Sequence, residues 1–182
     1  DRLARAVNID DLRSLAQRRL PRGVFDYIDG GADDEVTLRR SVDRFRDYTL
    51  SYDTLVDIAA IDTSRSVMGA PMRLPFFISP TAASRLFHIS GEPAVARAAH
   101  QAGIVYSIST LGSTSIEDIA KATPGPKLFQ IYVWKDRGLV KEVLQRVRAA
   151  GFHGVILTVD VPVAGNRERD PRNGFSIPPA VT

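Results

Sequence analysis

Four short apolar runs decide the fold: PFFIS (75–79), IVYSIS (104–109), LFQIYV (128–133) and GVILTV (154–159). Short and nearly continuous apolar runs are typical of strands that are buried on both faces, as in parallel sheets. The sequence therefore predicts four strands of a parallel sheet.

A helical signal lies in each gap between these runs. The first gap has Pro93 at a helix start and Gly103 after its end, and the second has Thr114 and Glu117 at the spacing of a capping box. The third has apolar residues at helical spacing: Val140, Val143, Leu144 and Val147. The strand–helix repeat suits either a doubly wound sheet or a (β/α)8 barrel. No Gly-x-Gly-x-x-Gly follows the first strand, which weakens the dinucleotide-binding alternative.

A helical segment precedes the strands. Asn8 and Asp11 can cap a first helix that stops at Pro21, a second short helix would reach Gly30, and the acidic residues 33–35 would start a third. From about residue 49 to residue 74, loops and a small hairpin are expected.

We therefore expect an α/β fold: the N-terminal half (strands 1–4) of a (β/α)8 TIM barrel, preceded by a helical N-terminal segment. Residues 1–74 would be helices and a hairpin packing on the barrel, and residues 75–182 its first four strands and three helices. A full barrel has roughly 250 residues, so the working polypeptide is expected to be longer or to be completed by a second fragment.

The composition excludes several classes of protein. The 182 residues are 44% hydrophobic and 25% charged, as in an ordinary globular domain. The net charge is only +3, and arginines alternate with aspartates and glutamates, so no basic surface that binds nucleic acid is expected. The chain has no cysteine, which excludes disulfides and thiolate chemistry within it. No apolar run approaches the roughly 18 residues of a membrane span and no signal-peptide core is present, so a cytoplasmic location is expected.

Polar residues gather where the predicted strands end, which is where barrel enzymes carry their active sites. They are Thr81 between Pro80 and Ala82, then Ser109, Thr110, Gln130, Tyr132, Thr158, Asp160 and residues 166–169 (NRER). A glutamine inside an apolar strand needs hydrogen-bond partners, which a flat ligand with a polar edge, neighbouring backbone or water could supply. Each residue alone is more often structural, but four strands that end in such residues favour a site.

Five segments carry a resemblance to a known family: LPRGVFDYIDGGADDE (20–35), ISPTA (78–82), STLGSTSIEDIA (109–120), FQIYVWKDR (129–137) and LTVDVPVAGNRERD (157–170). In this order, over nearly the whole chain, they resemble the FMN-dependent 2-hydroxy-acid oxidases and dehydrogenases. Members of that family include glycolate oxidase, lactate dehydrogenases and mandelate dehydrogenase.

The resemblance implies roles for particular residues. Pro80, Thr81 and Ala82 would face the flavin, and Ser109, Gln130 and Thr158 would hydrogen-bond its ring. Tyr27 and Arg167 would hold the substrate carboxylate, and Tyr132 would lie beside the substrate hydroxyl as the catalytic residue. Taken from the residues alone, Tyr27 could instead pack its helix, and Arg167 could pair with Glu168, Asp170 or Asp160. His88, His100 and His153 are assigned to surface or packing roles, and no metal site is expected.

Leu111 stands where glycolate oxidases carry a tryptophan over the substrate pocket. A leucine leaves more room there, which favours lactate or an aromatic hydroxy acid such as mandelate over glycolate.

The implied reaction oxidises an L-2-hydroxy acid to a 2-oxo acid, with electrons passing from FMN to a quinone, a cytochrome or oxygen. The resemblance also implies a homo-oligomer, a tetramer in the family, and leaves open a peripheral contact with the inner face of a membrane. The general-base histidine, the flavin lysine, the second arginine and the phosphate loops of the family would lie after Thr182. Two alternatives stay open: another FMN-binding barrel enzyme, which Tyr27 and Arg167 argue against, and a non-catalytic half-barrel that serves binding or assembly.

Overall fold

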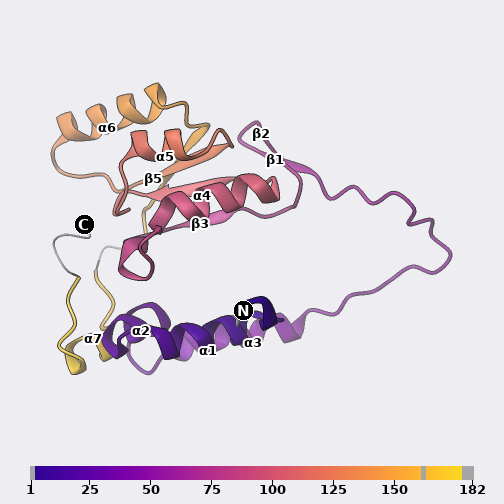
Figure 1. The fold of residues 1–182 in the computed structure, drawn as a ribbon, viewed down its shortest axis with the longest axis horizontal. Helices are drawn as coiled ribbons and strands as arrows, with labels where there is room; N and C mark the ends of the chain where they lie inside the picture. Colours follow the sequence, from indigo (N-terminus) through magenta and orange to yellow (C-terminus); the bar gives the residue numbers. More distant parts are fainter. Residues whose placement is uncertain (1–2, 161–162, 178–182) are drawn as a thin grey trace. The chain divides into compact units, whose positions relative to one another are not determined.

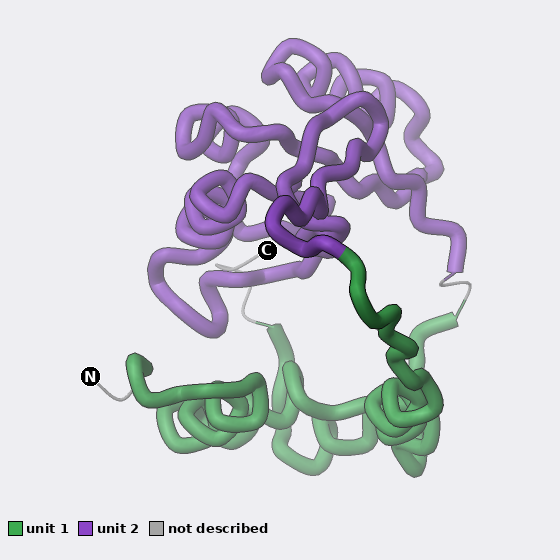
Figure 2. Tube along the Cα trace, turned by 90° about the vertical axis from the view of Figure 1, so that its right-hand side faces the viewer, with its two compact units in different colours: residues 1–56, 163–177 green, residues 57–162, 178–182 purple. Residues whose placement is uncertain are grey.

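The computed structural model describes residues 3–160 and 163–177, which belong to two compact units (Figures 1 and 2). Unit 1 comprises Asp1–Val56 and Val163–Ile177, and unit 2 comprises Asp57–Pro162 and Pro178–Thr182. No helix in these described ranges is long and apolar enough to cross a membrane.

Unit 1 is helical. Its α-helices are α1 (Ile9–Arg19), α2 (Arg22–Asp29), α3 (Val36–Asp43) and α7 (Arg169–Arg172), with 3-10 turns η1 (Leu3–Arg5) and η2 (Arg44–Asp47). The predicted cap of α1 is confirmed, because Asn8 Oδ1 accepts a hydrogen bond from the backbone N–H of Asp11 at 2.8 Å. Helix α7 contacts α2, so two segments far apart in sequence lie side by side within this unit.

Unit 2 holds the predicted strands. Strands β3 (Ile78–Thr81), β4 (Tyr106–Ser109), β5 (Lys127–Ile131) and β6 (Gly154–Leu157) form one parallel sheet in sequence order. Helices α4 (Gly91–Ala102), α5 (Ile116–Ala122) and α6 (Arg137–Ala149) connect them, and η3 (Ser84–Leu86) follows β3. The predicted hairpin is β1 (Arg65–Val67) with β2 (Ala70–Met72). The α/β class and the parallel sheet are therefore confirmed.

The two faces of the sheet have different neighbours. On one face Ile108, Phe129 and Ile131 pack with residues of α4, α5 and α6. Val105 and Leu128, which point the other way, pack with Ala70 and Met72 of the hairpin. On β6 the side chains paired with Phe129 and Ile131 are Val155 and Leu157, which stay 37% and 57% exposed. The helix-side cover of the sheet is thus incomplete at β6.

Two local predictions were wrong. The first strand begins at Ile78 and not at residue 75, so Pro80 and Thr81 lie within it. A proline is tolerated there because the pairing of β3 with β4 is irregular between Ile78 and Thr81. The predicted capping box at Thr114 and Glu117 is also displaced by one residue. Ser115 caps α5 by accepting from the N–H of Asp118 at 3.1 Å, since Thr114 donates its hydroxyl to a buried glutamate instead.

Candidate active site

Gln130 joins the carboxyl ends of three neighbouring strands. It is 3% exposed, and its Oε1 accepts from Ser109 Oγ at 3.0 Å and from the N–H of Thr110 at 3.1 Å. Its Nε2 donates to Thr158 Oγ1 at 2.7 Å. Because parallel strands end at the same edge of a sheet, three polar side chains far apart in sequence form one connected group. We call Ser109, Gln130 and Thr158 the amide triad.

The structure thus brings together the three residues that the sequence placed at a ligand edge. Neighbouring protein groups, which were the alternative to a ligand, occupy Gln130 Oε1 and one of the two amide hydrogens on Nε2. Hydroxyls can rotate to donate or accept, and an amide does both, so this group keeps hydrogen-bonding capacity toward a ligand.

The loops after β3 and β4 are linked by their backbones. The N–H of Ala83 donates to the carbonyl of Leu111 at 3.0 Å, and the N–H of Leu111 donates to Ser109 Oγ at 3.1 Å. Ala83 takes a left-handed conformation with φ 52°, while Ala82 before it is half-buried. The Leu111 side chain is 49% exposed and does not enter the core.

Tyr132 follows the last residue of β5 and is half-buried. Its backbone N–H donates to Thr110 Oγ1 at 3.2 Å, which fixes the chain at the same strand ends as the amide triad. His88, His100 and His153 are exposed.

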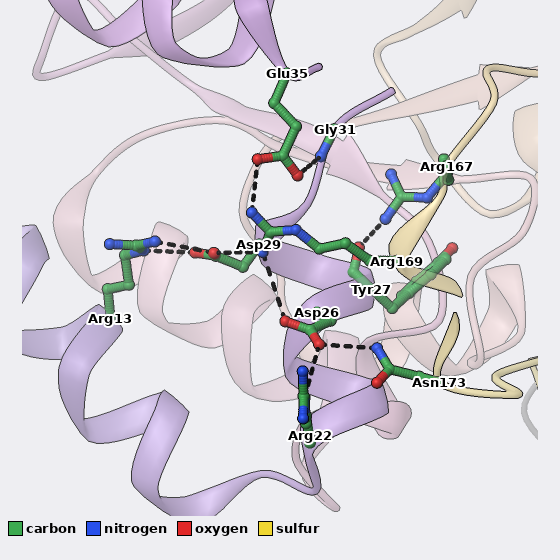
Figure 3. Close-up of polar contacts among 10 residues, drawn as sticks. All are labelled: Arg13, Arg22, Asp26, Tyr27, Asp29, Gly31, Glu35, Arg167, Arg169 and Asn173. Carbon is green, nitrogen blue, oxygen red and sulfur yellow. Dashed lines mark hydrogen bonds and ion pairs between the residues drawn. The ribbon is translucent and has the colours of Figure 1, made fainter. Parts of the chain in front are cut away.

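The other predicted pair lies in unit 1. The guanidinium carbon of Arg167 is 4.9 Å from the ring centroid of Tyr27, and Arg167 Nη2 donates to the Tyr27 carbonyl (Figure 3). Arg167 Nε also lies 2.9 Å from Asp170 Oδ2. Arg167 therefore lies beside Tyr27 as expected, and of the three acidic partners considered for it, Asp170 is the one that it contacts.

Arg169 lies in the predicted segment 166–169, but the sequence assigned it no partner and no role. Its guanidinium reaches three carboxylates: Glu35 at 2.6 Å, Asp29 at 3.2 Å and Asp26 at 3.5 Å (Figure 3). Asp29 is also held by Arg13, and hydrogen bonds from Arg13 first and Arg169 second lower the pKa of Asp29. We call Arg169 and its three carboxylates the Arg169 cluster. Asp26 and Asp29 are three residues apart on α2 and so share one helix face. This spacing in the sequence could have indicated that a basic side chain binds there.

Most of the chain matches one family of known proteins. A family model described as FMN-dependent dehydrogenase matches residues 16–182. The chain belongs to this family. A Mycobacterium tuberculosis protein named "Putative L-lactate dehydrogenase" is 50% identical over all 182 residues, which are 44% of its length. Glycolate oxidase 1 of Oryza sativa subsp. indica is 38% identical over 97% of this chain and 48% of its own.

Solved structures of FMN-dependent dehydrogenase relatives have the same fold over this region. A mandelate oxidase in complex with 3,3-difluoro-2-hydroxy-3-phenylpropionic acid matches with a TM-score of 0.92 and 38% identity, over 97% of this chain and 53% of that one. An (S)-mandelate dehydrogenase mutant matches with a TM-score of 0.91 and 38% identity, over 96% of this chain and 49% of its own. The chain spans about half the length of the curated relatives that it matches.

Proposed function

We propose that this chain binds FMN and takes part in the oxidation of an L-2-hydroxy acid of the lactate or mandelate type to the 2-oxo acid. Electrons would pass from FMN to a quinone, a cytochrome or oxygen. The observation that carries the proposal is the amide triad at the carboxyl ends of β4, β5 and β6 in a member of this family.

The triad fits the cofactor chemically. The flavin ring presents ring nitrogens and carbonyls along one edge, and such an edge needs several donors and one acceptor, the acceptor for its single ring N–H. Among the described residues Gln130 Nε2 makes one hydrogen bond, to Thr158, which leaves a second amide hydrogen for a carbonyl. Thr158 Oγ1 accepts from Gln130 and keeps its own hydrogen to donate, whereas Ser109 Oγ donates to Gln130 and keeps one lone pair as an acceptor. Bound FMN would supply the two-electron chemistry.

We assign the remaining residues as follows. Pro80, Thr81 and Ala82 lie along the flavin, and Tyr132 donates a hydrogen bond to the substrate oxygen. Arg167 binds the substrate carboxylate together with Tyr27. A guanidinium has five N–H donors in a planar fork, so Arg167 can keep its bonds to Asp170 and to the Tyr27 carbonyl and still offer donors to a carboxylate.

We further propose that the four strands are the first half of a (β/α)8 barrel, with a boundary between the N-terminal part and the barrel near residue 74. Two observations support the half-barrel. The relatives are about twice as long as the chain, and Val155 and Leu157 expose apolar surface on the side where helices cover the other strands. A cytoplasmic homo-oligomer is part of the same proposal.

The test is the absorbance of the purified full-length protein, with anaerobic addition of substrates. We expect the visible bands of bound flavin, bleached by L-lactate or L-mandelate and not by their D-enantiomers. A protein without flavin would be a binding or assembly module, and a flavoprotein that no 2-hydroxy acid bleaches would be another FMN enzyme. Either result refutes the proposal.

A further inference from the structure

A second polar group in unit 2 surrounds a single carboxylate. Glu92, the second residue of α4, is 0% exposed. It follows Gly91, whose φ of 45° is one that side chains other than glycine's rarely adopt. A Cβ at Gly91 would also lie only 2.7 Å from Arg85 Cγ. The chain therefore depends on glycine at the turn that brings Glu92 inside.

Four donors surround the Glu92 carboxylate. Oε1 accepts from the N–H of Ser84 at 3.1 Å and from the N–H of Ser113 at 2.7 Å. Ser113 Oγ lies 2.8 Å from Oε1 and 2.7 Å from Oε2, and Thr114 Oγ1 donates to Oε2 at 2.9 Å. In the described part of the chain no lysine, arginine or histidine forms an ion pair with Glu92.

Glu92 is held as an anion by neutral groups. Burial alone would raise its pKa, but the hydrogen bonds, led by those from Ser113, outweigh burial and leave the pKa below its ordinary value. The charge also acts on its surroundings, since burial first and the Glu92 charge second raise the pKa of Tyr106. Burying a charge without a counter-ion costs free energy of folding. The four hydrogen bonds that offset this cost indicate that the buried carboxylate has a role in the protein.

The donors come from the two loops that carry proposed site residues. Ser84 lies two residues after Ala82, and Ser113 lies two residues after Leu111. The backbone bond from Ala83 to Leu111 crosses between the same loops. The amide triad links β4, β5 and β6, but it does not reach the loop after β3. Glu92 adds a side-chain link to that loop, beside the backbone bond between Ala83 and Leu111.

We propose that Glu92 is a positioning residue whose carboxylate holds the loops after β3 and β4 in the conformation that binds FMN. This inference rests on the proposed function. It separates two roles within unit 2: the amide triad would contact the cofactor, whereas Glu92 would act on it only through the two loops.

The test is Glu92→Gln in the full-length protein. The retained amide oxygen can still accept from the backbone N–H groups of Ser84 and Ser113, and the hydroxyls of Ser113 and Thr114 can turn to accept from the new NH2. The variant should therefore fold, with loops held less firmly. Glu117→Gln is the matched control, because Glu117 is a partly exposed glutamate of α5 that pairs with Arg146 at the surface.

We expect FMN to bind at least tenfold more weakly to Glu92→Gln than to the control, measured by quenching of flavin fluorescence. The visible circular dichroism of the bound flavin should change, and kcat should fall more than KM rises, because Tyr27 and Arg167 belong to the other unit. A purely structural brace would lower Tm and leave these flavin signals unchanged, which would overturn the proposal.

If Glu92→Gln does not fold, Ser113→Ala decides the question. It removes only the hydroxyl that lies between both carboxylate oxygens, and we expect a smaller loss of FMN affinity in the same direction. Unchanged affinity in a folded Ser113→Ala protein would overturn the role of Glu92 while the proposed function stands. A wild-type protein that binds no FMN would overturn both.

Discussion

The two units hold their proposed site residues by different kinds of interaction. In unit 1, Arg167 lies two residues from Arg169, whose side chain is 31% exposed and pairs with three carboxylates. In unit 2, Gln130 and Glu92 are almost fully buried and are bonded to hydroxyls and backbone N–H groups. Salt and acid weaken partly exposed ion pairs, whereas a buried hydrogen-bond network is shielded from salt.

This difference predicts how each unit fails. Removing one group from a buried network leaves other polar atoms without partners. Both the free energy of unfolding and the affinity for any ligand held there should therefore fall. Removing one member of a partly exposed ion cluster lets water replace it. The loss of stability should therefore be smaller, and the main effect should be a shift of the neighbouring side chains.

The largest effect is expected for Gln130→Leu. The substitution replaces the amide by an apolar side chain of similar size and leaves Ser109 Oγ and Thr158 Oγ1 without their amide partner. An unsatisfied buried group costs about 1–3 kcal/mol, so we expect a loss of roughly 2–5 kcal/mol in the free energy of unfolding together with loss of bound FMN. Urea unfolding and flavin content measure the two effects.

Ser107→Ala is the control for this variant. Ser107 is 1% exposed on β4, and its hydroxyl has no hydrogen-bond partner among the described residues. Its removal should leave stability unchanged or slightly higher, with normal FMN content. Equal losses in the two variants would show that the buried polar groups of β4 and β5 do not act as a network.

Arg167→Lys should have the next largest effect, and it concerns unit 1. Lysine keeps the charge but cannot contact Asp170, the Tyr27 carbonyl and a carboxylate through one planar fork. Loss of a charge-assisted hydrogen bond is worth about 1.5–3 kcal/mol, or roughly ten- to more than a hundredfold in kcat/KM. Steady-state kinetics on L-lactate and L-mandelate provide the measurement.

The same kinetics show which state of the substrate Arg167 binds. A fall in kcat would mean that it stabilises charge that grows during oxidation, and a rise in KM alone would mean that it anchors the ground state. FMN content should stay near normal. An unchanged kcat/KM would leave Arg167 with only its structural contacts to Asp170 and Tyr27.

The sequence predicted the helices and strands of this fold better than the hydrogen-bond and ion-pair partners of its polar side chains. Strands appear as apolar runs because burial on both faces requires them, and Asn8 is a readable cap because its partner is three residues away. Thr114 was assigned the wrong partner because Glu92, 22 residues earlier, competes for its hydroxyl. Glu35 has its partner in Arg169, 134 residues later. Such pairings follow from the fold and not from local spacing.

Acid should loosen unit 1 through the Arg169 cluster. Hydrogen bonds from Arg169 and from the Gly31 backbone lower the pKa of Glu35, and Arg13 and Arg169 lower that of Asp29. Both carboxyls therefore contribute fully to stability at a pH above their ordinary pKa values of about 4. This contribution is lost as the pH falls through their lowered pKa values in the folded protein. Hydrogen exchange in residues 163–177 should rise over that range.

Arg169→Gln should reproduce this loosening at neutral pH. We expect faster exchange in residues 163–177 and a KM for the hydroxy acid raised by up to about tenfold, with little change in kcat. Arg172→Gln is the control, because Arg172 is an exposed arginine of the same helix that pairs only with Glu168 among the described carboxylates. A KM equal in both variants would mean that the cluster does not position Arg167.

The smallest effect is expected for Leu111→Trp. The Leu111 backbone is fixed by its bonds to Ser109 and Ala83, while its side chain is 49% exposed, so a larger side chain can be placed there without disturbing the loop. Bulk over the pocket should lower kcat/KM for L-mandelate more than for glycolate, by only a few-fold because an exposed ring can turn away. Leu144→Trp, at a similarly exposed position on α6, should leave the ratio unchanged. An equal ratio in both variants would mean that Leu111 does not line the substrate pocket, and that the room left by leucine at this position carries no information about the substrate.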